Sequence, residues 1–143
     1  MRATVLALLT LTYLSLSMAS VPTPGSYSLI NGTGGCPESL ELDKSCKSGF
    51  SLTPQINGTT MDSIDFCNIN SGPKVLDSGN NQRTIVKVSK DDTRLEKKET
   101  VVMVSSAGPI SLVSEDTLMA DGKSDLLWEH SRNQRGYSCL YRK

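Results

Sequence analysis

Four cysteines are the residues of this chain whose chemistry depends most on the compartment. None stands in a C-x-x-C pair, a spacing common in zinc and thiol-redox sites, so we expect no metal ion or other cofactor. In an oxidising compartment an even number of cysteines normally pairs into disulfides. Three pairings are open to these four: Cys36, Cys46, Cys67 and Cys139.

Residues for acid, base or nucleophilic catalysis are sparse. His130 is the single histidine, and no G-x-S-x-G motif surrounds any serine. Carboxylate pairs could bind calcium or act as the acid and base of a glycosidase, but none has the spacing of a known calcium loop. We interpret them as solvated turns and expect no enzyme; an extracellular hydrolase ranks last. The pairs are Asp91 with Asp92, Glu115 with Asp116, and Asp62 with Asp65.

The N-terminus predicts secretion. Arg2 supplies a positive charge, residues 5–11 form an apolar run, and Ser17-Met18-Ala19 is a small-x-small cleavage pattern. The apolar core is shorter than the roughly 20 residues that span a bilayer. We therefore expect a signal peptide over residues 1–19 and a secreted, extracellular single domain over residues 20–143, with the mature chain starting near Ser20.

Two N-x-Thr sequons then become candidate glycosylation sites. Asn31 and Asn57 are each followed by glycine and threonine. Asn-Gly is a frequent turn dipeptide, so both asparagines are expected in exposed turns between strands. The mature chain is predicted to be a glycoprotein.

Charge and composition narrow the class of partner. Without Arg2, 14 basic residues remain against 15 acidic ones, so no overall field attracts nucleic acid or an anionic membrane. Aromatic residues make up 5% of the chain, too few for rows of exposed rings that stack on sugars or bases. No later stretch is apolar enough to span a membrane. A monomer that binds a small hydrophobic ligand or an extracellular protein is the expectation.

The period of the apolar residues indicates an all-β fold. They recur at spacing two in seven runs, and turn dipeptides separate those runs. This predicts an antiparallel meander of about eight short strands, forming a small closed or nearly closed barrel. The runs are Tyr27/Leu29, Leu40/Leu42, Phe50/Leu52, Ile64/Phe66, Val86/Val88, Ile110/Leu112 and Tyr137/Cys139/Tyr141.

Two segments are ambiguous. Val101–Val104 is a continuous apolar run, either a strand buried on both faces or a short buried helix, and its β-branched residues favour the strand. Residues 87–99 carry charges of both signs, typical either of a partner-docking patch or of a solvated hairpin tip or exposed turn of helix. Because the charges nearly cancel, we favour the solvated reading.

Barrel closure suggests one of the three disulfide pairings. In an up-and-down barrel the first and last strands are neighbours, and Cys36 and Cys139 lie near them. A Cys36–Cys139 bond would staple that seam and contribute about 4 to 5 kcal/mol in the chain-entropy model. Cys46–Cys67 would close a shorter loop, contributing about 3 kcal/mol. We favour the pairing that combines Cys36–Cys139 with Cys46–Cys67.

The two ends of the chain resemble those of small secreted lipocalin-like (calycin) barrels. The resemblance is carried by Gly25-Ser26-Tyr27-Ser28-Leu29, by Cys36-Pro37 and by the closing Tyr137-Ser138-Cys139-Leu140-Tyr141. Tyr27 stands where that superfamily has the tryptophan of Gly-x-Trp, and Arg142 or Lys143 could be its basic partner. The resemblance implies a cup-shaped barrel that binds a small apolar ligand.

Two functions are therefore open besides the hydrolase. In a ligand carrier, inward side chains line the barrel; in small barrels the same side chains often fill a solid core instead. The alternative is an extracellular interaction or matrix protein, such as a secreted inhibitor or structural component, for which residues 49–65 are the candidate exposed loop. The predicted lining residues are Tyr27, Leu29, Phe50, Leu52, Phe66, Tyr137 and Tyr141.

Overall fold

A computed structural model of the chain describes residues 22–143, except residues 78, 80, 92–93 and 122–123. The predicted signal peptide and Ser20 lie outside this part. Every regular element in the described part is a β-strand, as the alternating apolar pattern predicts. No helix in this part is long and apolar enough to cross a membrane.

The described part of the chain forms eleven strands, not about eight. The predicted apolar runs include none in β4 and β6, which are short and exposed, and none in β10. The strands are β1 (Gly25–Gly32), β2 (Ser39–Ser45), β3 (Gly49–Ile56), β4 (Thr59–Thr60), β5 (Ile64–Phe66), β6 (Lys74–Asp77), β7 (Gln82–Lys90), β8 (Arg94–Ser105), β9 (Gly108–Asp121), β10 (Asp125–Arg132) and β11 (Arg135–Arg142).

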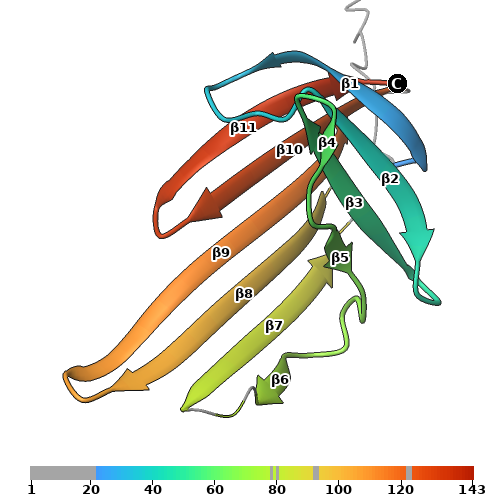
Figure 1. Cartoon of the computed structure of the whole chain (residues 1–143). Helices are drawn as coiled ribbons and strands as arrows, with labels where there is room; N and C mark the ends of the chain where they lie inside the picture. Colours follow the sequence, from blue (N-terminus) through green and yellow to red (C-terminus); the bar gives the residue numbers. More distant parts are fainter. Residues whose placement is uncertain (1–21, 78, 80, 92–93, 122–123) are drawn as a thin grey trace, which may run out of the picture.

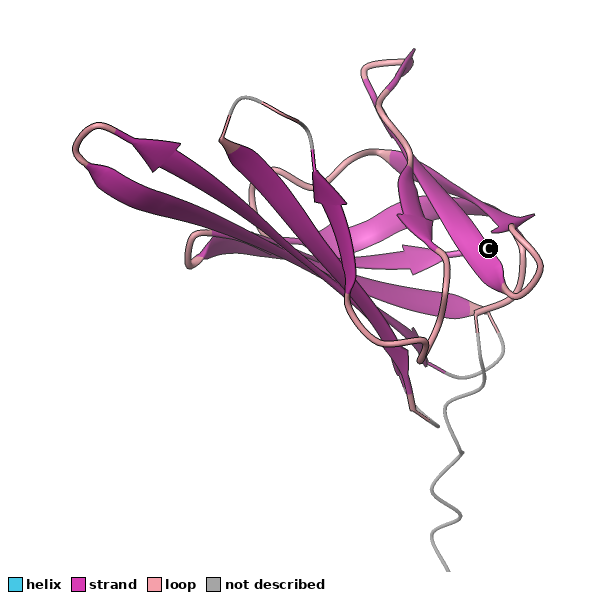
Figure 2. Ribbon diagram, turned by 90° about the horizontal axis from the view of Figure 1, so that it is seen from below, coloured by secondary structure: helices cyan, strands magenta, loops and turns pink. Residues whose placement is uncertain are grey.

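All eleven strands belong to one antiparallel sheet in the order β4-β3-β2-β1-β11-β10-β9-β8-β7-β6, with β5 pairing β3 (Figure 1). The predicted pairing of the first and last strands is confirmed, since β1 pairs β11. Figure 2 shows the strands curling round near the C-terminus, while a long hairpin projects on the other side. The curl brings β2, β3 and β5 across the concave face of β7–β10, which we call the inner face.

The sheet does not close into a barrel, in contrast to the expectation of a closed one. In the described part, no strand ladder joins β4 or β5 to β6 or β7. The chain after β5 cannot continue as a strand because Asn68, Asn70 and Gly72 all have positive φ angles of 57°, 57° and 82°. Asn70 crosses part of the gap instead: its N–H donates to Val88 O (2.9 Å), and its Oδ1 accepts from Lys90 N–H (3.0 Å).

A packed apolar core fills the curled end of the sheet. It joins residues from β1–β3 and β5 to residues from β7–β11, so it holds the two halves together. The buried members are Tyr27, Leu40, Leu42, Leu52, Phe66, Val88, Leu95, Leu118, Leu126, Trp128, Cys139 and Tyr141.

Both disulfides have the favoured pairing. Cys36–Cys139 staples the β1–β11 seam with a Cα–Cα distance of 5.7 Å, and Cys46–Cys67 joins the β2–β3 turn to the end of β5 with 6.1 Å. No cysteine in the described part is free.

The ambiguous segments are strands. Val101–Val104 lies in β8, but it is half-buried to exposed and not buried on both faces. Residues 87–99 belong to the β7–β8 hairpin, with residues 92–93 outside the described part. The solvated reading is correct only in part, because Val88 and Leu95 are buried in the core and Lys97 is half-buried. Residues 49–65 contain β3, β4 and the start of β5, so they are not an exposed loop.

Both sequon asparagines are exposed. Asn57 occupies the β3–β4 turn with φ 51°, as predicted. Asn31 is not in a turn: it lies in β1, next to an irregularity in the pairing with β11. The strand therefore continues through Asn31 and Gly32, with a β-bulge in place of a turn.

Candidate binding site on the inner face of the sheet

The strand register brings polar side chains from β8–β11 into one row. Lys97 is opposite Asp116, Asp116 is opposite His130, and His130 is opposite Tyr137. Each lies two residues along its strand from a buried core residue, so all four are on the inner face. The row therefore lies directly beside the apolar core.

Asp116 is the buried polar residue of this row, with 6% of its surface exposed. Its Oδ1 accepts hydrogen bonds from Trp128 Nε1–H (3.0 Å) and from the His130 Nδ1 (2.7 Å). A buried carboxylate is tolerated when it accepts such bonds. The prediction that Glu115 and Asp116 form a solvated turn is wrong: both are in β9, and Glu115 faces outward to pair with Lys98 (2.6 Å).

The bond to Asp116 fixes the orientation of His130. A carboxylate can only accept, so the proton lies on Nδ1 and leaves Nε2 for an incoming group. The Tyr137 ring packs against His130 at a centroid distance of 5.0 Å and edge-on against Trp128 at 5.3 Å. Burial, with the negative charge of Asp116, raises the pKa of Tyr137 to about 12, so its phenol stays a neutral donor.

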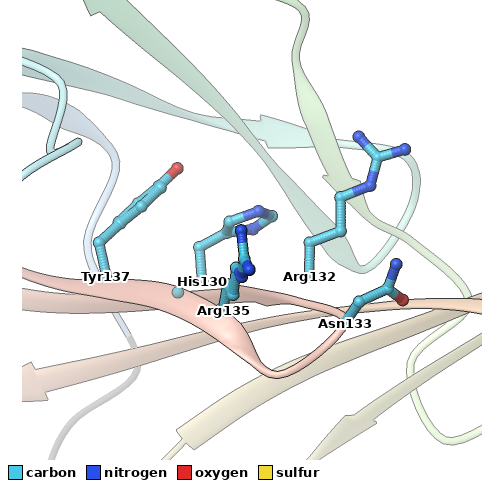
Figure 3. Close-up of a pocket in the computed structure, with 6 residues that line it drawn as sticks. His130, Arg132, Asn133, Arg135 and Tyr137 are labelled. Carbon is cyan, nitrogen blue, oxygen red and sulfur yellow. The ribbon is translucent and has the colours of Figure 1, made fainter.

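A second row lies beyond the first one. Glu99 is opposite Ser114, Ser114 is opposite Arg132, and Arg132 is opposite Arg135 across the β10–β11 hairpin. Figure 3 shows Arg132, Arg135, His130 and Tyr137 rising from the same side of this hairpin. Glu99 pairs with Lys97 (3.5 Å), whereas neither arginine has a salt-bridge partner among the described residues.

The segment leading into β5 lies over the two rows and forms one wall of a cavity of about 360 Å³ that is open to solvent on one side. Thr53 Oγ1 and Ser63 Oγ are 2.7 Å apart, and Met61 N–H donates to Pro54 O (2.9 Å), which fixes the segment to β3. The lining residues are Asp62, Ser63, Ile64, Lys97, Glu99, Val101, Leu112, Val113, Ser114, Asp116, His130 and Arg132.

A more open hollow adjoins the cavity over the β10–β11 hairpin (Figure 3). It has a volume of about 590 Å³ and shares His130 and Arg132 with the cavity. The other residues around it are Asn133, Arg135, Gly136 and Tyr137. Cavity and hollow together form a site with apolar, cationic and hydrogen-bonding walls.

Among the described residues, the Asp116–His130 pair is not part of a nucleophile–histidine–acid triad. Within the described ranges, no serine, threonine or cysteine is hydrogen-bonded to His130, so the Asp116–His130 pair has no nucleophile to activate. No three side chains of His, Cys, Asp or Glu in the same ranges could hold a metal ion together.

Asp62 and Asp65 line different hollows of the surface. Asp65 is exposed on β5 and Asp62 is at the cavity rim. Asp91 accepts a hydrogen bond from Arg94 N–H (2.8 Å) in the β7–β8 turn, as a turn residue should. Asp92 lies outside the described residues.

The predicted lining residues lie mostly in the core. Tyr27, Leu52, Phe66 and Tyr141 are buried there, and Leu29, Phe50 and Tyr137 pack against them. The hollow over the hairpin includes Tyr137, whereas neither it nor the cavity includes the other six. The sequence pattern did not indicate Lys97, Arg132 or Arg135 as site residues, and it placed Asp116 in a solvated turn. A spacing of two along the strand could have placed them on the inner face: Lys97 from Leu95, Asp116 from Leu118 and Arg132 from His130.

No protein-family model matches this chain, and no curated protein matches it significantly.

Proposed function

We propose that the protein is a secreted, extracellular glycoprotein that binds a small amphipathic ligand on the inner face of its sheet. The observation that supports it is the cavity of about 360 Å³ beside the oriented Asp116–His130 pair. A volume of this size is in the range of small-molecule sites, which combine apolar walls with a few fixed polar groups.

The walls of the cavity favour an amphipathic ligand over a wholly apolar one. Ile64, Val101 and Leu112 supply apolar surface, while His130 and Arg132 supply polar groups. The curled end of the sheet, where the lipocalin-like resemblance places an apolar ligand, is filled by the core instead. An apolar body against the first three residues and a polar head at the last two would satisfy both kinds of wall.

Other features fit secretion and the lipocalin-like resemblance. Two disulfides suit an oxidising compartment, and both sequon asparagines are exposed to a glycosyltransferase. Lys143, one of the two basic residues singled out in the resemblance, donates from Nζ to Pro24 O (2.7 Å) at the start of β1. Arg142 pairs with Asp125.

Native mass spectrometry of the secreted, deglycosylated protein tests the proposal. We expect a retained small molecule or, after its removal, rebinding of one from a lipid extract. Ser114→Tyr, which places a ring in the cavity, should abolish binding. The matched control is Ser111→Tyr, since Ser111 is exposed on the outer face of the same strand. Equal binding by both variants, or no binding by the wild type, would contradict the proposal.

A second candidate is interaction with an extracellular protein. Large apolar side chains are exposed at Val75 (58%) and Leu76 (43%) on the edge strand β6, and at Val104 (59%) on β8. An exposed edge strand can pair with another chain. Charge substitutions at Val75 and Leu76 should abolish a specific complex with an extracellular protein and leave small-molecule binding unchanged.

A further inference from the structure

We infer that the polar head of the ligand is a phosphate monoester, recognised by Arg132 and Arg135 at the β10–β11 hairpin. This inference rests on the proposed function, because it names the chemistry of a ligand whose apolar part would occupy the cavity. The identity of the polar head is inferred from a feature outside the Asp116–His130 pair, namely the two arginines of the hollow in Figure 3.

The hairpin turn places the two guanidinium groups on one face. Arg132 and Arg135 are directly opposite each other in the register, joined by a two-residue turn. Asn133 and Gln134 in that turn have φ angles of 49° and 68°, as a tight hairpin of this kind requires. Side chains directly opposite in a hairpin have Cβ atoms about 5 Å apart.

The turn is also held in place from the side. Asn133 N–H donates to Val113 O (2.9 Å), and Val113 N–H donates to Asn133 Oδ1 (3.0 Å). These two bonds tie the hairpin tip to β9, which continues past the end of β10. The arginines therefore project from a braced hairpin and not from a free loop.

Two like charges directly opposite each other are unfavourable without a counter-ion. The carboxylates of the site do not supply one: Asp116 accepts from Trp128 and His130, and Glu99 pairs with Lys97. Among the described residues, no acid is within ion-pair distance of either arginine. A bound dianion would remove this repulsion.

The geometry favours a phosphate monoester. Guanidinium groups bind phosphate oxygens through paired N–H donors, and two of them match its double negative charge. Tyr137 lines the same hollow and adds an aromatic wall beside the two arginines. Because Arg132 also lines the cavity, an alkyl chain on the phosphate can extend toward Leu112.

Isothermal titration calorimetry with four probes tests the inference: hexyl phosphate, inorganic phosphate, 1-hexanol and hexylamine. We expect hexyl phosphate to bind most tightly. Arg132→Gln and Arg135→Gln should each weaken hexyl phosphate binding roughly ten- to hundredfold, as expected for lost charge-assisted hydrogen bonds. Arg83→Gln removes the same charge from an exposed position on β7 and should leave the affinity unchanged.

The outcomes separate this inference from the proposed function. Equal binding of 1-hexanol and hexyl phosphate would overturn the phosphate head and leave the amphipathic site standing. Tighter binding of hexylamine would overturn it too, and would point to Asp62 at the cavity rim. Inorganic phosphate binding as tightly as hexyl phosphate would support the arginine site but contradict the apolar part of the proposed function. Binding by none of the four would overturn the inference.

Discussion

Replacing Asp116 by alanine is the substitution that most directly tests the organisation of the site. Asp116 is 6% exposed and its Oδ1 accepts from the indole N–H of Trp128, which is itself 1% exposed, and from His130. Alanine would leave the indole N–H buried without a partner. His130 is partly exposed, so its ring could turn toward water.

The magnitude follows from these contacts. Hydrogen bonds to a charged group contribute about 1.5 to 3 kcal/mol each, and a buried unsatisfied donor costs about 1 to 3 kcal/mol. The desolvation of the carboxylate, which alanine relieves, offsets part of this loss. We expect Asp116→Ala to lower the free energy of unfolding by about 2 to 4 kcal/mol. Asp116→Asn keeps an acceptor oxygen and should cost less, about 1 to 2 kcal/mol.

Urea unfolding followed by far-UV circular dichroism measures the effect. Glu115→Ala is the matched control, because Glu115 directly precedes Asp116 in β9 and pairs with Lys98 on the exposed face. Exposed ion pairs contribute little, so this variant should unfold close to the wild-type midpoint. If Asp116→Ala were no more destabilising than Glu115→Ala, the buried hydrogen-bonded carboxylate would not organise this face of the sheet.

Three further predictions concern the frame around the site. Gly49→Ala should destabilise the protein strongly, because a Cβ at Gly49 would collide with a β5 backbone carbonyl and the Cys46–Cys67 bridge; equal thermal midpoints for variant and wild type would contradict this. The contribution of the two buried phenols to the free energy of unfolding should be constant below pH 10 and fall above it by about 1.4 kcal/mol per pH unit for each group, since burial raises the pKa of Tyr137 from 10.0 to about 12 and also raises that of Tyr141. Absorbance at 295 nm should show two late-ionising phenols, and ionisation of both near pH 10 would be inconsistent with their burial. Replacing both members of the seam disulfide by serine should cost about 2 to 5 kcal/mol, measured by the urea midpoint, and an unchanged midpoint would mean that the staple does not stabilise the seam.

The parts of the fold that follow a local pattern could be predicted from the sequence. Alternation at Tyr27/Leu29 and at Tyr137/Cys139/Tyr141 marked the first and last strands, and their pairing followed from an up-and-down arrangement. The favoured disulfide pairing depended on that arrangement and is confirmed.

The open gap in the sheet could not be predicted, because it depends on backbone conformations at single residues. Asn68 and Asn70 adopt positive φ angles that asparagine permits but does not require. An ordinary extended conformation there would let β5 run on toward β6. The sequence has no further signal that separates the two outcomes.

The site was missed because its contacts are between strands. Asp116 was interpreted with its neighbour Glu115 as a turn, although its spacing of two from Leu118 placed it on the inner face. Its partners Trp128 and His130 are 12 and 14 residues away, beyond the reach of any local pattern. Only the register of β9 against β10 brings them together.

The indole of Trp128 offers the most direct measurement of the central claim, that a ligand binds on the inner face beside the Asp116–His130 pair. The chain has one tryptophan, so its Nε1–H gives a single indole signal in a ¹H–¹⁵N NMR spectrum. Titration with hexyl phosphate should shift this signal and those of Arg132 and Tyr137, with the Arg83 backbone amide unchanged. Binding without any shift at Trp128, or shifts confined to β6, would contradict the account.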